Sequence, residues 1–213
     1  LDSKAELYGE FHYNDAKLNL RDLLLDSDHA RAATIGIQKI FSSKNNDVKY
    51  LFSWEWTQME QTSSRLIREA NSWYRHRWVY HGYTNNGEVM GSAIGPGSNS
   101  HYFSLKRLKK LMKLGLAIEI VDNDNDFYYY AFERDGELYG DFRRYWKDFN
   151  FILSYEHRFK NLMISSDFVI SRNLNYQWEI EPNPDPWYTS GKDVNNLHLN
   201  LKMTYFIPKI FKN

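Results

Sequence analysis

Apolar and polar residues alternate with a period of two over segments of about ten residues, and the alternation recurs along the whole chain. Between residues 48 and 60, for example, Tyr50, Phe52 and Trp54 occupy every second position, with polar or charged residues at most positions between them. A period of two places the two sets on opposite faces of a β-strand. About ten residues is also the length that a tilted strand needs to cross a bilayer. The pattern therefore predicts amphipathic strands.

Eight segments show this alternation, at residues 5–13, 32–41, 48–60, 101–106, 114–121, 149–157, 162–180 and 197–205. The connections between them alternate in length. Residues 42–47, 107–113 and 158–161 make short polar turns, whereas 14–31, 62–100, 122–148 and 181–194 are long. Short turns on one side of the membrane and long loops on the other are typical of bacterial outer-membrane barrels. We expect an all-β, antiparallel up-and-down barrel that spans the bacterial outer membrane.

Composition excludes several other classes of protein. No apolar run approaches the roughly 20 residues of a membrane-spanning helix. Lys and Arg balance Asp and Glu at 27 each, so the chain lacks the broad basic field of a nucleic-acid-binding protein. It also has no cysteine, which rules out thiolate metal sites and disulfides. A soluble β-sandwich or lipocalin-like barrel would alternate in the same way, but aromatic pairs near strand ends favour the girdles of a membrane barrel.

The length of the loops bears on the size of the barrel. Eight strands could close a small barrel, but loops this long suit a larger one. We therefore expect residues 1–213 to form the C-terminal part of one outer-membrane barrel domain, with its earlier strands upstream.

The longest connection combines aromatic, basic and glycine residues. Aromatic faces stack on sugar rings, and Arg, His and Asn supply hydrogen bonds, so this segment suits a polysaccharide. The candidate glycan-binding residues are Trp73, Tyr74, Arg75, His76, Arg77, Tyr80, His81 and Tyr83. The alternative is that these aromatic side chains form the upper girdle of the barrel, and that the glycines shape turns. Asn86-Gly87 predicts a tight hairpin turn.

Acidic side chains recur on the polar faces of the strands. We expect them to face the lumen in a charged network rather than to form a catalytic pair; they are Glu10, Glu55, Glu119, Asp167 and Glu179. The sequence has no nucleophile elbow, no His-Glu-x-x-His motif and no convincing acid/base pair. We therefore do not expect an enzyme.

Two sequence patterns are weak indications of a metal site. His76 and His81 lie five residues apart, with no third ligand at a recognisable spacing. Residues 122–126 read DNDND, which is similar to part of a calcium loop but lacks its invariant Gly and its terminal Glu. We expect surface histidines and a solvated loop, with no metal and no cofactor.

Two further motifs allow a comparison with a known family. Residues 52–60 read FSWEWTQME, and residues 73–100 read WYRHRWVYHGYTNNGEVMGSAIGPGSNS, with a Tyr-x-His, a Gly-Tyr before a Gly-containing turn, and a Gly-x-x-x-Gly-x-x-Ser segment. With residues 8–16, 21–23 and 29–41, these segments resemble the capsule assembly Wzi family of outer-membrane proteins, over about half of the chain. The resemblance implies a barrel of about eighteen strands with a periplasmic helical element upstream. It also implies that surface capsular polysaccharide is assembled or anchored by binding, not by catalysis.

These observations combine into one hypothesis with two alternatives. The chain is expected to contact outer-membrane lipid and lipopolysaccharide, surface polysaccharide and other envelope proteins, and not nucleic acid. The first alternative is an accessory or plugged barrel subunit of a larger transport or secretion complex. The second is an outer-membrane lipase or protease, which the absence of a recognisable triad disfavours.

Overall fold

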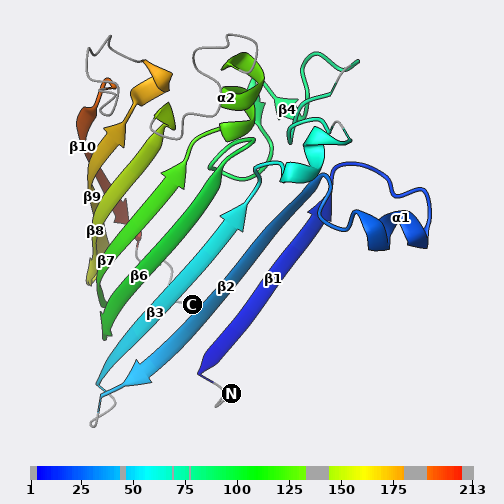
Figure 1. Ribbon diagram of the computed structural model, residues 1–213. Coiled ribbons are helices and arrows are strands. Elements are labelled where there is room, and N and C mark those ends of the chain that lie inside the picture. The colour runs from blue at the N-terminus through cyan, green and yellow to red at the C-terminus, as the bar shows by residue number, and fades with distance from the viewer. Residues whose placement is uncertain are drawn as a thin grey trace.

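The alternating segments form strands of one sheet. The computed structural model in Figure 1 describes residues 4–43, 47–68, 70–76, 78–132, 144–179 and 191–207. Its main sheet contains β1 (Ala5–Tyr13), β2 (Arg31–Ser42), β3 (Val48–Gln58), β6 (Asn99–Lys109), β7 (Met112–Asp122), β8 (Lys147–Phe159), β9 (Leu162–Leu174) and β10 (Val194–Tyr205). The prediction of eight strands is confirmed, since each predicted segment overlaps one of them.

Each strand of this sheet pairs antiparallel with the next one in the order β1-β2-β3-β6-β7-β8-β9-β10. The connections contain the hairpin β4 (Thr84–Asn85) and β5 (Glu88–Val89), and the helices α1 (Leu20–Leu25) and α2 (Asn125–Phe132). Within the described residues, β1 pairs only with β2 and β10 only with β9, so the sheet has two open edges. None of the described helices is long and apolar enough to span a membrane.

Short and long connections lie at opposite ends of the strands, as the sequence predicts (Figure 1). Two residues join β6 to β7 and two join β8 to β9. The first residue of each turn, Lys110 or Lys160, has a positive φ of 51° or 50°. We call this end of the sheet the short-turn edge and the opposite end the long-loop edge. The long-loop edge carries α1, α2 and the β4–β5 hairpin.

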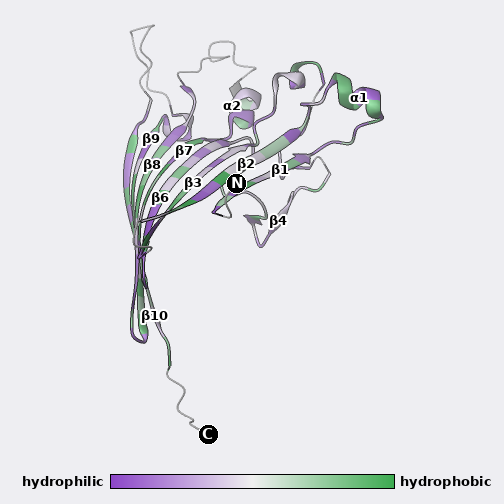
Figure 2. Cartoon of the chain, turned by 90° about the horizontal axis from the view of Figure 1, so that it is seen from below, coloured by the Kyte–Doolittle hydropathy of each residue, from purple (hydrophilic) through white to green (hydrophobic). Residues whose placement is uncertain are grey.

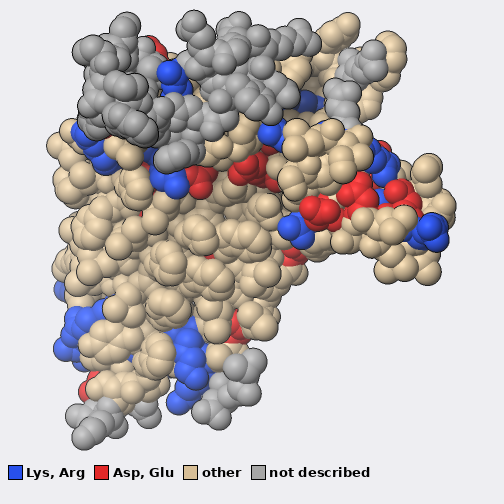
Figure 3. Space-filling model, viewed as in Figure 1, with Lys and Arg blue, Asp and Glu red and all other residues tan. Residues whose placement is uncertain are grey.

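One face of the sheet is apolar and exposed across all of its strands. A row of directly paired residues runs through Leu7, Ile37, Trp54, Phe103, Ile118, Phe151, Ile170 and Leu197. Ile118 remains 49% exposed and Leu197 72% exposed. Strands about 4.8 Å apart make this face roughly 35 Å wide. Figure 3 shows it as a band with few charges between two charged edges.

The opposite face carries matching rows of polar residues. One of them contains Tyr8, Gly36, Glu55, Tyr102, Glu119, Asn150, Ser171 and Asn196. Hydrogen bonds run along it, because Asn150 donates to Glu119 at 3.0 Å and Ser171 donates to Asn150 at 2.6 Å. In Figure 2 the sheet bends into an arc with the β4 hairpin on its inner side. The polar face is therefore concave and the apolar face convex.

A glycine permits a close contact within the polar row. A Cβ atom on Gly36 would lie 2.1 Å from the ring of Tyr8, so the ring rests directly over the glycine. The Tyr8 hydroxyl thereby reaches across β2 and donates a hydrogen bond of 2.7 Å to Glu55 on β3. This contact links the first three strands on the concave face.

The predicted strand at residues 162–180 is too long. β9 ends at Leu174, because Asn175 adopts a left-handed conformation with φ of 52°, and a short 3-10 turn, η3 (Tyr176–Trp178), follows. The ring of Trp178 packs instead against Trp146 and Phe127, with centroid distances of 5.3 and 4.9 Å. The alternation that continues beyond Leu174 thus belongs to an aromatic cluster in the loop, and it does not reflect a strand.

Candidate functional site

The connection between β3 and β6 folds back over the concave face and encloses a groove. Its cavity volume is about 450 Å³, within the range of small-molecule sites. The strands contribute Tyr8, Glu10, His12, Ala32, Ala33, Thr34, Glu55 and Thr57, and the connection contributes Met59, Trp73, Tyr74, Gly91 and Ser92. Residues from three neighbouring strands and one loop therefore meet at a single site.

The floor of the groove is polar and acidic. Glu10 and Glu55 stand on the concave face, and among the described residues no Lys or Arg lines the groove with them. His12 lies 3.6 Å from the Glu10 carboxylate. Thr34 and Thr57 share a hydrogen bond of 3.1 Å between their hydroxyl groups. These carboxylates and hydroxyls can accept and donate hydrogen bonds to a hydroxyl-rich ligand.

Trp73 and Tyr74 form the wall of the groove, and the fold holds both in place. The Trp73 indole N–H donates to the carbonyl of Arg31 at 3.4 Å. The Tyr74 hydroxyl accepts from the Ser92 backbone N–H at 2.8 Å. A Cβ atom on Gly91 would lie 2.2 Å from the Tyr74 ring, so only glycine allows this approach. Tyr74 therefore links the beginning of the segment at residues 73–92 to its end.

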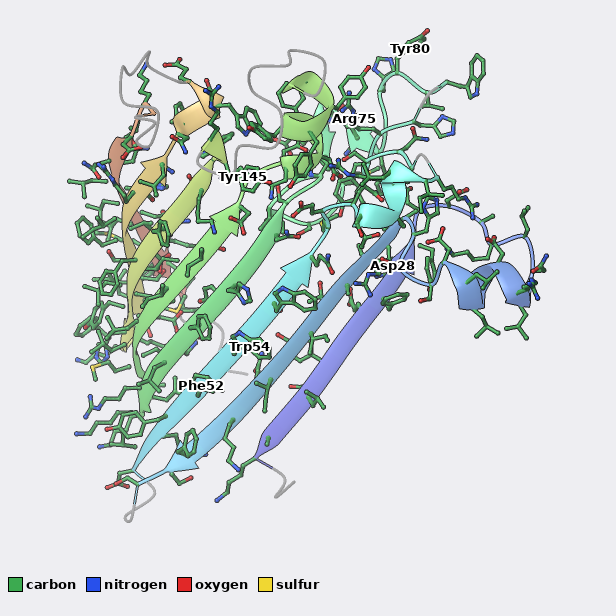
Figure 4. All side chains as sticks on the ribbon, in the orientation of Figure 1. Asp28, Phe52, Trp54, Arg75, Tyr80 and Tyr145 are labelled. Carbon is green, nitrogen blue, oxygen red and sulfur yellow. The ribbon has the colours of Figure 1, made fainter. Side chains whose placement is uncertain are left out.

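The other predicted glycan-binding residues lie outside the groove. Arg75, His76, Tyr80, His81 and Tyr83 are exposed, with Tyr80 at 96%. In Figure 4 Tyr80 points away from the sheet at the outer end of the segment. Arg77 lies outside the described residues. The structure thus divides the predicted set into a wall, made by Trp73 and Tyr74, and an exposed tip.

Two turns shape this tip. Asn86 and Gly87 both have positive φ, 51° and 85°, and they join β4 to β5. The predicted hairpin is therefore confirmed. His76 accepts hydrogen bonds from the backbone N–H groups of Trp78 and Val79 at 3.2 Å, which fixes the first turn of the tip.

The predicted lumen-facing acids divide in a similar way. Glu10, Glu55, Glu119 and Asp167 lie on the concave face. Glu179 lies beyond the end of β9, where it is exposed and pairs with Lys192 at 2.8 Å. It is therefore not a member of the polar rows of the sheet.

A buried acidic cluster at the base of the segment corrects the expectation of a solvated loop at residues 122–126. Asn125 and Asp126 are only 4% and 7% exposed. The Gln61 backbone N–H donates to Asp126 at 2.9 Å, and Asn125 donates to Glu60 at 3.1 Å. The cluster therefore joins the end of β3 to the start of α2. Among the residues that the structure describes, no group of His, Asp and Glu is arranged to hold a metal ion.

Burial controls the ionisation of this cluster. Burial raises the pKa of Asp126 to about 6, although the hydrogen bond from the Gln61 backbone N–H opposes the shift. Burial also raises the pKa of Asp124, against the Phe127 N–H that it accepts and the nearby Arg75 guanidinium. The charge of Arg75 thus connects the exposed tip electrostatically with the cluster at its base.

Sequence reasoning missed several lining residues, among them Tyr8, His12, Thr34 and Thr57. They share the concave face with Glu10 and Glu55, so the period of two could have identified them once those acids were chosen. Met59 and Ser92 could not be identified in this way, because they reach the groove through the course of the loop.

No family model matches the chain, and no curated protein or solved structure matches it either. The similarity to the capsule assembly family therefore stays a prediction.

Proposed function

We propose that the chain forms part of a β-barrel in a bacterial outer membrane, with its convex face against lipid. The width of the apolar face supports this, because monomeric soluble proteins rarely expose contiguous apolar patches above a few hundred Å². The open edges of β1 and β10 also support it. Backbone groups at a bare edge have no partner in lipid, so further strands would complete the ring.

The short-turn edge and the long-loop edge, at the two ends of the strands, indicate how the sheet would be oriented in the membrane. In bacterial barrels the short turns face the periplasm and the long loops face outward. The long-loop edge, which carries the groove and the tip, would then face the outside of the cell. A ligand of the groove would reach it from the cell surface or from the lumen.

We further propose that the groove and the tip bind a surface polysaccharide, as the resemblance to the capsule assembly family implies. The supporting observation is the fold-back of residues 73–92, which places Trp73 and Tyr74 opposite Glu10 and Glu55. Aromatic faces pack on the C–H faces of sugars, while carboxylates accept hydrogen bonds from sugar hydroxyls. The exposed Tyr80 and His81 would extend the contact beyond the groove.

Replacement of Trp73 tests this proposal. Trp73→Ala is expected to weaken binding of polysaccharide extracted from the bacterial surface by about fivefold or more, because loss of a central aromatic contact costs more than about 1 kcal/mol. Binding would be measured by calorimetry with the protein in lipid vesicles. Trp178→Ala is the matched control, since that indole lies at the same edge but outside the groove.

A second variant tests the contribution of the exposed tip. Combined Ala replacement of Arg75, Tyr80 and His81 alters only exposed side chains and leaves the turn at His76 intact. This variant should retain less polysaccharide on the cell surface while the barrel still assembles. Unchanged retention, together with unchanged affinity of Trp73→Ala, would rule out polysaccharide binding at this site.

Exposed apolar side chains at α1 favour a second candidate function, that of a barrel subunit in a larger envelope complex. α1 extends sideways beyond β1 (Figure 1), and its Leu24 and Leu25 are 72% and 74% exposed. Leu18 and Leu20 in the same connection, and Leu66 and Ile67 in the β3–β6 connection, add further exposed apolar side chains. The two connections meet where Arg68 pairs with Asp22 of α1 at 3.0 Å. Apolar patches outside a lipid-facing band are typical of protein interfaces. Purification with a stable partner protein would favour this function.

A further inference from the structure

The short-turn edge of the sheet has an excess of basic side chains. Its described basic residues are Lys4, Lys39, Lys49, Lys106, Arg107, Lys109, Lys110, Lys113, Arg158, Lys160 and Lys202, and its acidic residues are Glu6, Asp47, Glu156 and Asp167. Figure 3 shows basic groups gathered at this end of the convex face, directly below the apolar band. The whole chain is nevertheless neutral, so the excess is local.

Three of these cations stand on the convex face, Lys39 on β2 and Arg107 and Lys109 on β6, with β3 between the two strands. Arg107 is paired with Tyr50 in one row, and Lys109 lies one pair closer to the turn on that face. Lys39 on β2 extends over the ring of Phe41, with its ammonium 5.9 Å from the ring centroid. Aromatic and basic side chains thus alternate where the apolar band ends. This mixture is typical of the region where a membrane protein meets lipid headgroups.

These three cations have no acidic partner among the described residues, because the ion pairs of the sheet lie elsewhere. The long-loop edge of the same face differs. There Lys147 pairs with Asp122 at 2.8 Å, and Arg172 pairs with Asp193 at 2.7 Å. These two pairs are neutralised within the chain, whereas Lys39, Arg107 and Lys109 remain available to a ligand.

We propose that Lys39, Arg107 and Lys109, with Lys110 in the adjoining turn, bind the phosphate groups of anionic phospholipids. The inference rests on the proposed membrane location and adds the leaflet and the lipid charge to it. Long basic side chains can extend from the end of an apolar band to the headgroups, where an anionic surface favours each of them by about fivefold. The basic edge would thus fix the depth of the barrel in the leaflet on the short-turn side.

Native mass spectrometry of the protein released from mixed vesicles tests the proposal. The vesicles contain equal amounts of zwitterionic phosphatidylcholine and anionic phosphatidylglycerol. Wild-type protein is expected to retain phosphatidylglycerol in at least about tenfold excess. The variant Lys39→Gln, Arg107→Gln, Lys109→Gln should retain the two lipids about equally. The control Lys49→Gln, Lys106→Gln, Lys202→Gln removes the same charge from the concave face and should keep the preference.

The outcomes are distinct. Equal lipid retention by the wild type, or an unchanged preference in the convex-face variant, would overturn the proposal while the membrane location stands. Equal loss in both variants would show a general effect of charge, which also overturns it. A protein that stays outside the vesicles would refute the membrane location itself. A dimer without lipid would show that a second copy of the chain covers the face.

Discussion

Leu199→Arg is expected to lower the free energy of unfolding in lipid vesicles by about 2–4 kcal/mol, the cost of an arginine on the lipid face near the bilayer midplane. Leu199 stands on the convex face of β10, where 65% of its surface is exposed. In water such an exposed leucine would tolerate arginine with little loss, since surface substitutions usually change stability by less than about 0.5 kcal/mol. Reversible denaturant titration of the vesicle-embedded protein measures the difference.

The neighbouring residue supplies the control. Asn200 lies next to Leu199 on the concave face and is also exposed. Asn200→Arg adds the same side chain to the same strand, but on the polar side, and it should change stability little. Equal effects of the two substitutions would mean that the two faces of the sheet have the same surroundings. That result would contradict a lipid-facing convex surface.

Asp126→Asn is expected to raise the free energy of unfolding at neutral pH by about 3 kcal/mol, because the neutral amide avoids the cost of a buried charge. The pKa of Asp126 is about 6 in the folded protein and 3.8 as the reference value. Between these values the folded state binds more protons, so stability falls as pH rises. The destabilisation is complete above the folded pKa and absent below the reference value.

Unfolding measured from pH 4 to pH 8 checks this sign. The difference between wild type and Asp126→Asn should grow with pH across the window between the two pKa values and then level off. The amide oxygen of Asn still accepts the Gln61 N–H, so the hydrogen bond of 2.9 Å is retained. Asp47→Asn, at the opposite edge, controls for the loss of one carboxylate. A difference that is constant with pH would contradict a raised pKa of the buried Asp126.

The strands and their faces could be predicted from the sequence because they follow from a local period. The segment at residues 5–13 coincides with β1, and the turn at Asn86-Gly87 was identified by its dipeptide. Trp54 and Glu55 were assigned to opposite faces, as the register confirms. Each of these predictions depends only on neighbouring residues and on backbone conformation.

The groove and the acidic cluster depend on contacts between distant segments. Tyr74 meets Ser92 and Met59 only because the loop returns over the sheet. Asp126 accepts a hydrogen bond from the backbone N–H of Gln61, which lies 65 residues earlier in the chain. The DNDND motif alone could therefore not distinguish this buried acid from a solvated one. The end of β9 was missed for a related reason, since the left-handed Asn175 interrupts a pattern that continues in the sequence.

Contact between the convex face and lipid is tested most directly by single cysteines placed at residues 197–202 of β10. The chain has no cysteine, so each site can carry one spin label without background. In lipid vesicles we predict that labels at 197, 199 and 201 collide mainly with dissolved oxygen, and that labels at 198, 200 and 202 collide mainly with a water-soluble nickel complex. Equal access of the nickel complex to all six labels would contradict the claim.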